Sequence, residues 1–412
     1  MTARLEPQAW MTSRATAAVL DALEAAGGPG CARFVGGCVR NALMGRPVDD
    51  IDIATTLEPP AVIRALEAAG LKAVPTGVEH GTVTAVSERR PYEITTLRRD
   101  VSTDGRRAVV AFTDDWAEDA QRRDFRFNAL FADRDGTLFD PTGHGVQDAR
   151  DGRVVFVGDP AQRIREDALR ILRFFRFHAW FGAGAPDAAA LTACAEGVAL
   201  LEGLSAERCQ KELLKLLGAE DPVPAVELMR GSGALEVLLP QADGFERLAR
   251  LVALQRGVLH EADPVLRLAA LAAADSAAAA DTVVRLRLSN SQGERLSAVA
   301  ASAPDVREDM TPAALRAAVY RAGSGTVADR LTVAWAEAGG DETRWLALLD
   351  LARTWTPPRL PITGEDIMAA GVAQGPQVGR VLRTVEDWWI ARDFPDDRDQ
   401  LLQWAGAAVE EG

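Results

Sequence analysis

Short apolar segments separated by turn-forming residues dominate the first 155 positions of the chain. Nine of these segments have the length of strands: CARFVGG, DIDIAT, LKAVPTG, GTVTAVS, YEITTLR, VVAFT, ALFAD, GTLFD and RVVFVG. Two stretches with helical spacing, GCVRNALMG and EPPAVIRALEAAG, fall among them, and the N-terminus has the pattern of an amphipathic helix. The alternation predicts an α/β or α+β domain.

From about residue 158 the pattern changes to one apolar-periodic helix after another. Examples are AQRIREDALRILRFFRFHAW, SAERCQKELLKLLGA and RVLRTVEDWWIARDF. The segment Trp355–Asp366 contains three prolines and is expected to interrupt the helices with extended backbone. No repeat of solenoid period is visible. The second part of the chain is therefore predicted to be all-α.

Composition narrows the class of protein. The 412 residues suffice for two to four structural units, and 48% apolar with 26% charged residues is ordinary for a globular protein. No apolar stretch reaches the roughly 18 residues of a membrane span, and the N-terminus lacks the apolar run of a secretory signal. The four cysteines form no CxxC pair, which argues against a disulfide framework, a zinc cage or an iron–sulfur centre. We expect a cytoplasmic protein without a membrane partner.

The net charge of −14 would disfavour a nucleic-acid partner, because phosphate is contacted mainly by Lys and Arg. The charge is uneven, however: residues 1–180 contain 24 basic and 26 acidic side chains, whereas residues 181–412 contain 22 and 34. Only three of the 46 basic residues are lysines. The positive charge is thus carried by guanidinium groups, which suit bidentate phosphate contacts, although a GC-rich genome explains the same bias.

A pair of acidic residues stands out in the segment FVGGCVRNALMGRPVDDIDIAT. Asp50 and Asp52 are two positions apart on a predicted strand and point to one side, whereas Asp49 points to the other. Two carboxylates with few histidines nearby favour a hard cation such as Mg²⁺, shared with substrate phosphates. Alone, this pattern is typical of a solvated strand edge.

The same segment places a glycine-rich turn before the acidic pair. Gly36 and Gly37 open a predicted helix whose N-terminal N–H groups are free to approach a phosphate, and Arg40 follows one turn later. Two glycines alone more often form a plain turn. Their order and spacing with the acidic pair favour a nucleotide-binding site.

The segment GGCVRNALMGRPVDDIDIAT resembles the G-G-x-V-R-D-x-L-x-G…D-x-D signature of the class II tRNA nucleotidyltransferase/poly(A) polymerase family, part of the polymerase-β-like nucleotidyltransferase superfamily. Four further segments of the chain resemble the later motifs of the family, in the same order. They are PYEITTLRRDVSTDGRRAVVAFTDDWAEDAQRRDFRFNAL, DGTLFDPTGHGVQDARDGRVVFVGDP, RIREDALRILRFFRF and SAERCQKELLKLL. Five motifs in this order make the resemblance specific in the first half of the chain, whereas the last part resembles the family only loosely.

The resemblance implies an α+β fold, in which a polymerase-β-like nucleotidyltransferase domain with a small mixed sheet and flanking helices precedes an all-α C-terminal half. It implies a catalytic head and palm over residues 1–155, a helical neck for nucleobase recognition and RNA binding over 156–240, and a helical body and tail for tRNA binding over 241–412. The implied activity is the addition of C, C and A to tRNA 3′ ends from CTP and ATP with Mg²⁺, without a DNA partner.

Several alternatives stay open within and outside the family. Poly(A) polymerases carry an R-R-F-x-L-x-H-V segment, where this chain has PTGVEHGTVTAV, and its tail is acidic rather than basic. This favours the tRNA enzyme. An enzyme restricted to C addition, to A addition or to poly(A) synthesis is the main alternative, and a non-catalytic RNA-binding protein is another.

The resemblance also implies roles for the acidic residues. Asp50 and Asp52 are expected to hold the metal and to be catalytic. Nucleotidyl transfer builds charge on the attacking and leaving oxygens, which two metal ions can clamp. Glu93 lies on a neighbouring predicted strand and matches a third catalytic carboxylate that helps activate the RNA 3′-hydroxyl; the alternative is a solvated strand residue.

The motif RRDFRFNAL is implied to contact the ribose and the triphosphate of the nucleotide through Arg123, Asp124 and Asn128. Asp124 and Asn128 share a face if the segment is helical, and a surface charge cluster is the alternative. The chain departs from the family pattern at Arg126, where Thr is usual, and at Asn41, where Asp is usual. Both departures leave the proposed metal ligands in place.

A further pair is implied to read the incoming base. Asp167 and Arg170, three positions apart on a predicted helix, are expected to lie side by side and to match the amino group and ring nitrogen of cytosine or adenine. Arg173 and Arg176 are expected to extend a basic face toward the nucleotide or RNA, with structural pairing to Glu166 as the alternative. The polar segment Arg98–Asp115 is expected to be mobile, which the resemblance links to the change from CTP to ATP.

Overall fold

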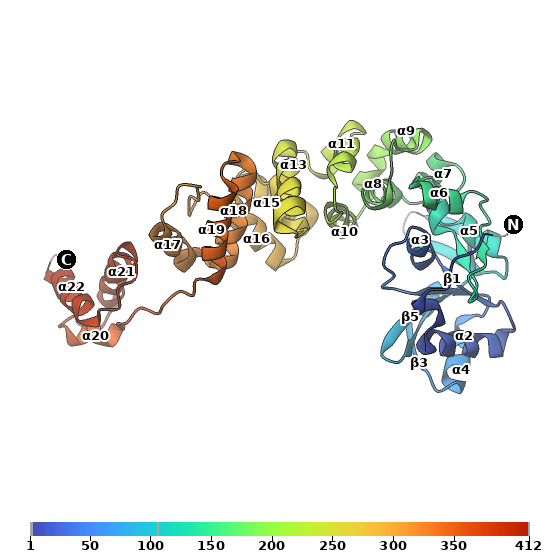
Figure 1. Ribbon diagram of the computed structural model, residues 1–412, viewed down its shortest axis with the longest axis horizontal. Helices are drawn as coiled ribbons and strands as arrows, with labels where there is room; N and C mark the ends of the chain where they lie inside the picture. Colours follow the sequence, from blue (N-terminus) through green and yellow to red (C-terminus); the bar gives the residue numbers. More distant parts are fainter. Residues whose placement is uncertain (1–2, 105–106, 411–412) are drawn as a thin grey trace. The chain divides into compact units, whose positions relative to one another are not determined.

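The computed structural model describes residues 3–104 and 107–410, and the chain divides into two compact units, Met1–Pro240 and Gln241–Gly412 (Figure 1). In the described residues the first unit contains strands and helices, and the second contains helices only. The predicted α+β class with an all-α C-terminal half is confirmed. The strands are β1 (Ala32–Val35), β2 (Asp52–Thr55), β3 (Lys72–Gly77), β4 (Thr82–Ser87), β5 (Arg90–Thr96), β6 (Arg98–Asp104), β7 (Arg107–Phe112), β8 (Phe131–Ala132) and β9 (Leu138–Phe139).

Seven of these strands form one mixed sheet in the order β3-β4-β5-β2-β1-β8-β9. The pairing of β2 with β5 is parallel, and the other pairings are antiparallel. Strands β6 and β7 pair antiparallel and separately from the large sheet, within the predicted mobile segment Arg98–Asp115; residues 105–106 lie outside the described residues. The expected strand RVVFVG was wrong, because Phe156 makes only an isolated bridge to Phe125.

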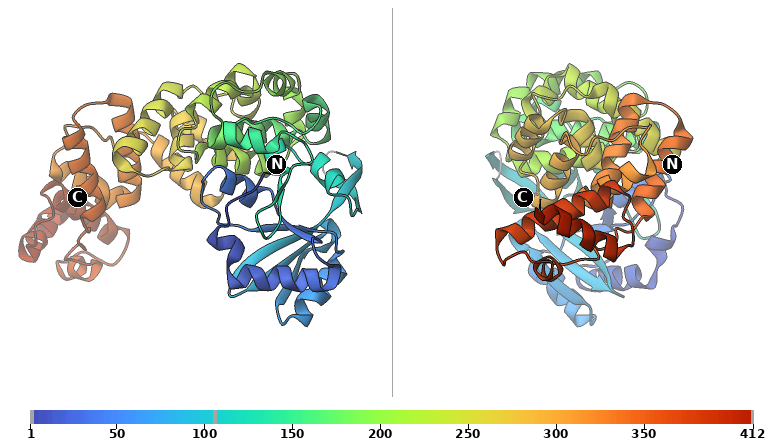
Figure 2. Two further views of the ribbon diagram at one scale, coloured as in Figure 1. Left: turned by 45° about the vertical axis from the view of Figure 1, so that its right-hand side comes forward. Right: turned by 90° about the vertical axis from the view of Figure 1, so that its left-hand side faces the viewer.

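The helices of the first unit flank the sheet and then continue the chain beyond it. They are α1 (Ala9–Thr12), α2 (Arg14–Gly27), α3 (Gly37–Leu43), α4 (Pro59–Ala68), η1 (Val78–His80), α5 (Trp116–Gln121), η2 (Arg126–Asn128), α6 (Gly145–Asp151), α7 (Pro160–Glu166), α8 (Leu169–Phe181), α9 (Ala188–Glu196), η3 (Val198–Gly203), α10 (Ala206–Leu217), α11 (Val223–Gly231) and α12 (Ala234–Leu238). Helices α2 and α4 pack on each other and on one face of the sheet (Figure 2). The predicted N-terminal helix is interrupted at Ser13, whose side chain caps α2 by accepting from the Thr16 N–H.

Buried phenylalanines join α8 to the end of the sheet-bearing region. Phe125 and Phe127, around η2, pack against Phe177 of α8 with ring centroids 5.2 and 5.6 Å apart. Phe156 stacks on Phe174 of the same helix at 6.1 Å. Aromatic pairs of this kind contribute about 0.5–1.5 kcal/mol beyond the burial of their area. The aromatic core therefore holds α8 in a defined place relative to the β8 region.

The second unit consists of helices with their own cores. They are α13 (Phe245–Leu254), the π-helix η4 (Gln255–Leu259), α14 (Pro264–Ala272), α15 (Ser276–Leu286), α16 (Asn290–Ala300), α17 (Pro312–Ala322), α18 (Ser324–Ala338), α19 (Glu342–Thr354), α20 (Gly364–Ala369), α21 (Pro376–Ala391) and α22 (Arg398–Glu410). Trp335 and Trp345 stack in one core, and Trp389 is buried in another. The predicted interruption after α19 is confirmed, although α20 already begins at Gly364.

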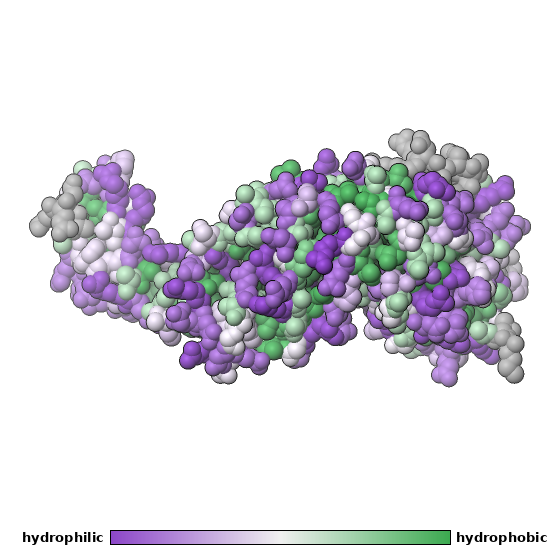
Figure 3. Space-filling model, turned by 90° about the horizontal axis from the view of Figure 1, so that it is seen from above, coloured by the Kyte–Doolittle hydropathy of each residue, from purple (hydrophilic) through white to green (hydrophobic). Residues whose placement is uncertain are grey.

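The hydropathy of the surface is as expected for a globular protein of this composition. The face drawn in Figure 3 is largely hydrophilic, with smaller hydrophobic areas between the polar residues. Among the described residues, no helix combines the length and the apolar character that crossing a membrane requires.

Candidate active site

The turn between β1 and α3 needs glycine at its first position. Gly36 adopts φ +70° and ψ −119°, which side chains rarely allow, and its N–H donates to the carbonyl of Leu130 at 3.1 Å. A side-chain carbon at Gly36 would lie 3.7 Å from Nη1 of Arg123, and one at Gly37 would lie 3.9 Å from Nη2 of Arg40. Two guanidinium groups therefore lie close to the glycine turn, although only the backbone conformation of Gly36 requires glycine.

The predicted catalytic carboxylates come together where β2 begins, beside β5 in the middle of the sheet. Asp52 is the first residue of β2, and the parallel register places it opposite Glu93 of β5. Asp50, which was expected on the same strand, lies two positions before β2 begins; it is exposed, as is Glu93. Burial, followed by the negative charge of Glu93, raises the pKa of Asp52 to about 6, and Asp50 contributes in the same direction. Arg123 also acts on Asp52, in the opposite direction. The three carboxylates therefore repel one another where a cation would neutralise them.

Asp52→Asn is expected to stabilise the protein at neutral pH when metal is absent. The pKa of Asp52 is raised from 3.8 to about 6, so the folded state binds this proton more tightly than the unfolded chain. Stability from this group is complete below pH about 4 and is lost as the pH rises to about 6, by up to about 3 kcal/mol. Urea unfolding in EDTA across this range should show the loss in the wild type and not in the variant. Parallel pH profiles for the two proteins would contradict the expectation.

Arg40 is buried at the base of the site. Its Nη1 donates to Oδ1 of Asn128 at 2.6 Å, and its Nη2 donates to Oδ1 of Asn41 at 2.8 Å. Its guanidinium also lies 3.9 Å from the ring centre of Phe181. Burial lowers the pKa of Arg40 to about 10, opposed by the charge of Asp124, so it stays protonated at neutral pH. The unusual Asn41 thus acts as an acceptor that orients Arg40.

Asp119 orients Arg123 and was missed by the sequence analysis. It is buried on α5 and accepts from Arg122 at 2.7 Å and from Arg123 at 2.9 Å. Burial would raise the pKa of Asp119, but the two guanidinium groups hold it below its usual value. The signal was an acid one helical turn before two consecutive arginines, a spacing that also occurs in ordinary surface pairs.

Asp124 and Asn128 contact each other, but not on the predicted helix. Asp124 lies between α5 and η2, and its Oδ1 accepts from Nδ2 of Asn128 at 3.1 Å. Its Oδ2 accepts from Nε of Arg173 at 2.7 Å. Burial would raise the pKa of Asp124, but Arg173 and these hydrogen bonds hold it below its usual value. Hydrogen bonds therefore link Arg40 through Asn128 and Asp124 to Arg173.

Arg173 and Arg176 project from α8 toward a second acid that the sequence analysis missed. Glu212 of α10 is buried and pairs with Nε of Arg176 at 2.6 Å and with Nη1 of Arg173 at 3.8 Å. The alternative of pairing with Glu166 is therefore wrong for both arginines, because their partner on α10 is Glu212, whereas Glu166 pairs with Arg163 and Arg170. Arg126, which departs from the family pattern, also pairs with a buried acid: its Nε lies 2.7 Å from Oδ2 of Asp148.

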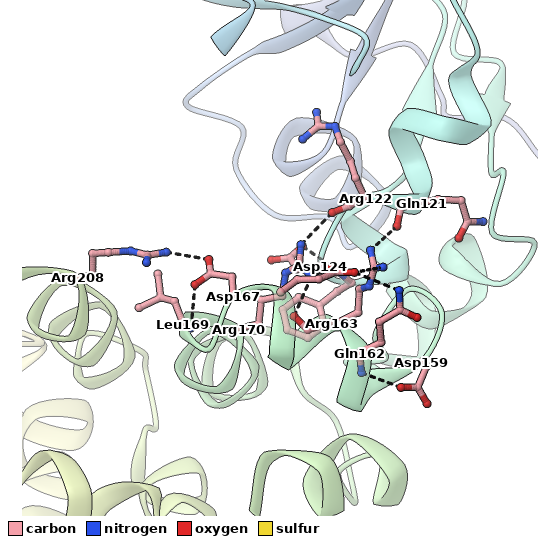
Figure 4. A network of polar contacts seen from close by, with 12 residues as sticks. Gln121, Arg122, Asp124, Asp159, Gln162, Arg163, Asp167, Leu169, Arg170 and Arg208 are labelled. Carbon is pink, nitrogen blue, oxygen red and sulfur yellow. Dashed lines mark hydrogen bonds and ion pairs between the residues drawn. The ribbon is translucent and has the colours of Figure 1, made fainter. Parts of the chain in front are cut away.

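The predicted base-reading pair does not lie on one helix. Asp167 ends α7 with φ −154° and ψ 106°, and Arg170 lies in the first turn of α8. Arg170 donates to Oε2 of Glu166 at 2.7 Å and to the carbonyl of Arg122 at 3.0 Å (Figure 4). Asp167 instead accepts from Arg208 of α10 at 2.8 Å. The expectation that the two side chains lie side by side on a helix was wrong, because the helix breaks between them.

The carboxylate oxygens of Asp50 and Asp52 fit a hard cation that also binds oxygen atoms of a substrate. In the described part of the chain, no group of three or more His, Cys, Asp or Glu side chains is arranged to hold a metal by itself. Mg²⁺ commonly takes only one or two protein carboxylates and completes its shell with water and phosphate oxygens. Asp50 and Asp52 match this requirement, and the negative charges of Glu93 and Asp50 add to the burial that raises the pKa of Asp52.

Two family models match the chain. The model described as "Poly A polymerase head domain" matches residues 32–155, and that described as "Probable RNA and SrmB- binding site of polymerase A" matches residues 187–245. The "CCA tRNA nucleotidyltransferase 1, mitochondrial" of Danio rerio is 32% identical over 379 residues, which cover 90% of this chain and 86% of the relative. The "CCA-adding enzyme" of Levilactobacillus brevis is 32% identical over 395 residues, covering 93% and 95%.

A solved structure agrees over nearly the whole chain. The Bacillus stearothermophilus CCA-adding enzyme in complex with CTP superposes with a TM-score of 0.80 at 28% identity, covering 97% of this chain and 98% of that one. The Thermotoga maritima CCA-adding enzyme complexed with tRNA shares the fold with a TM-score of 0.65 at 21% identity, covering 92% and 91%.

Proposed function

Because this chain belongs to the class II tRNA nucleotidyltransferase/poly(A) polymerase family and is a nucleotidyltransferase, we propose that it adds C, C and A to the 3′ ends of tRNA from CTP and ATP. Relatives named as CCA-adding enzymes match over most of their length, which favours this activity over poly(A) synthesis. The observation that carries the proposal is the register of β2 and β5, which sets Asp52 beside Glu93 with Arg123 close to the same carboxylate.

Asp50 and Asp52 are proposed to hold Mg²⁺, which when bound stabilises charge on the attacking and leaving oxygens of nucleotidyl transfer. Glu93 is proposed to accept a hydrogen bond from the RNA 3′-hydroxyl and to orient that hydroxyl toward the α-phosphate. Arg123 and Arg40, beside the glycine turn, are proposed to bind the triphosphate. We propose that two metal ions take part in this reaction.

The neighbouring polar groups are proposed to keep these guanidinium groups in place. Asn128 accepts from Arg40, and Asp124 accepts from Arg173, so each arginine has a defined orientation before nucleotide arrives. Direct contacts of Asp124 and Asn128 with the ribose, and of Arg173 and Arg176 with the nucleotide, stay predictions. An arrangement set in advance lowers the entropy lost when the phosphates bind.

Base selection is proposed to depend on Asp167 and Arg170. A carboxylate accepts from the amino group of cytosine or adenine, and a guanidinium donates to the adjacent ring nitrogen. Uracil and guanine present a carbonyl where the amino group is needed, which would leave polar groups unpaired and disfavour them. In this proposal residues 1–155 carry out catalysis, residues 156–240 recognise the base and RNA, and residues 241–412 bind tRNA.

The decisive test is incorporation of labelled CTP and ATP into tRNA ending before C, before CC and before CCA, with and without Mg²⁺. Products are resolved at single-nucleotide length. The proposal predicts Mg²⁺-dependent extension that stops after CCA. Incorporation of one nucleotide type only would indicate a C-adding or A-adding enzyme, and unlimited A addition would indicate a poly(A) polymerase. No incorporation on any end would favour an RNA-binding protein.

A further inference from the structure

Arg40 is held by neutral side chains, unlike the other arginine beside the glycine turn. It is only 8% exposed, and each of its three guanidinium nitrogens donates to an amide oxygen. Nη1 donates to Asn128 at 2.6 Å, and Nη2 and Nε donate to Asn41 at 2.8 and 3.2 Å. Within the described part of the chain Arg40 forms no ion pair, whereas Arg123 pairs with the carboxylate of Asp119 at 2.9 Å. Among these residues the charge of Arg40 is therefore oriented by amides and not neutralised by contact with an acid.

The two ends of the Asn41 side chain are distinguished by their partners. Arg40 has only donors, so the amide oxygen of Asn41 must face it and the amide nitrogen must face away. That nitrogen donates to the carbonyl of Pro47 at 2.9 Å. Aspartate, the residue that the family usually has at this position, has no nitrogen to donate to Pro47 and would neutralise Arg40. Asparagine therefore orients the guanidinium, as an aspartate would, while it leaves the positive charge uncompensated.

The buried charge of Arg40 favours an anionic ligand. Burial lowers the pKa of Arg40 to about 10, against the charge of Asp124, so the group stays charged at neutral pH. The ring centre of Phe181, 3.9 Å away, offsets part of the cost of burying a cation. The contacts with amide oxygens leave one N–H on each of the two terminal nitrogens. A phosphate group both accepts from these N–H groups and compensates the charge.

We infer that Asn41 is a positioning residue for the phosphates of the nucleotide, because it orients Arg40 through a neutral acceptor and leaves the full positive charge to the ligand. The inference rests on the proposed role of Arg40 in triphosphate binding and extends it to the neighbouring residue. A carboxylate at position 41 then has opposite effects on two properties. It stabilises the free protein by pairing with Arg40, and it weakens the binding of phosphates because it competes with them for the same charge.

The test measures the binding of inorganic pyrophosphate in the presence of Mg²⁺ by isothermal titration calorimetry, together with the Tm of the protein without ligand. Pyrophosphate presents phosphates without a base, so the result does not depend on which nucleotide the enzyme adds. Asn41→Asp is expected to lower the affinity roughly tenfold, the effect of about one hydrogen bond to a charged group, without lowering the Tm. Asn41→Ala should lower the affinity less, because Arg40 keeps its charge and loses only its orientation.

Asn290→Asp is the matched control for the added charge. Asn290 is exposed on α16 in the second unit, and the substitution changes the total charge of the chain by the same amount. The affinity of this variant for pyrophosphate should equal that of the wild type.

Three results would overturn the inference. One is an Asn41→Asp variant that binds pyrophosphate as tightly as the wild type, and another is a wild type that does not bind it. The third is weaker binding together with a lower Tm in Asn41→Asp, or weaker binding in Asn41→Ala than in Asn41→Asp, either of which would indicate that Asn41 acts only as a structural link to Pro47. The proposed function fails separately, when the wild type does not complete CCA on tRNA, and the pyrophosphate affinities then still decide the role of Asn41.

Discussion

Asp52→Ala is expected to lower nucleotide incorporation at least about 1000-fold, the largest effect expected of a single change in this chain. The substitution removes one of the two carboxylates proposed to hold Mg²⁺, and it leaves Glu93 without its neighbour across the β2–β5 pairing. A metal that stabilises developing charge contributes several kcal/mol to the barrier, which corresponds to such a factor. Single-turnover incorporation of CTP into tRNA lacking CCA measures the rate directly.

Asp49→Ala is the control for this result. Asp49 is the same residue type within the same acidic segment, is exposed, and is not one of the proposed metal ligands. Its backbone carbonyl, which accepts from Arg90, is kept in the variant. The rate should stay within a factor of about three of the wild type, as for an ordinary surface change. Similar losses of rate in both variants would mean that the total negative charge of the segment, and not the Asp52 carboxylate itself, supports the reaction.

Strand parity is a local property, and it predicts that Asp50 and Asp52 point to one side. In the structure only Asp52 lies on β2, because the strand begins at that residue and Asp50 precedes it. The parallel pairing of β2 with β5 is not local, because it depends on the crossover of the intervening chain. Glu93 could therefore be placed beside Asp52 only through the family resemblance.

The position of the base-reading pair was not predictable from its own segment. The sequence RIREDALRILRFF has a continuous helical pattern and contains no glycine or proline at the point where α7 ends. The break at Asp167 occurs where Arg208 and the Leu169 N–H both bind the carboxylate. The contact with Leu169 is local, whereas the contact with Arg208 is tertiary and leaves no periodic signal in the sequence.

Buried acids that neutralise the arginines were also missed. Asp119, Glu212 and Asp148 pair with arginines of the motifs. The sequence presented a run of arginines that suggested a free basic face. In the folded chain these acids pair with the arginines, so in the proposed function the substrate phosphates would meet guanidinium groups whose orientation is already set.

Asp124→Ala is expected to destabilise the first unit by about 3–5 kcal/mol. Asp124 is buried, and its two oxygens accept from Phe125 N–H, Asn128 and Arg173. Removal of the carboxylate leaves the guanidinium of Arg173 without its closest acid and frees the Asn128 amide that orients Arg40. The cost of an uncompensated buried charge is larger than the net value of an intact ion pair. Urea unfolding followed by far-UV circular dichroism measures the loss.

Asp124→Asn and Asp167→Ala are the control variants for this prediction. The first tests how much of the stability loss comes from the missing charge, and the second tests how much depends on the burial of the ion pair. The asparagine keeps the shape and an acceptor oxygen but not the charge, so its loss should lie between those of the wild type and the alanine variant. Asp167→Ala removes an acid paired with arginine at 28% exposure, and such a partly exposed pair should cost no more than about 1 kcal/mol. Equal destabilisation by Asp124→Ala and Asp167→Ala would show that the buried connection from Arg40 to Arg173 does not stabilise the unit. A large loss confined to Asp124 would show that the arginines of the proposed site depend on this one carboxylate for their orientation.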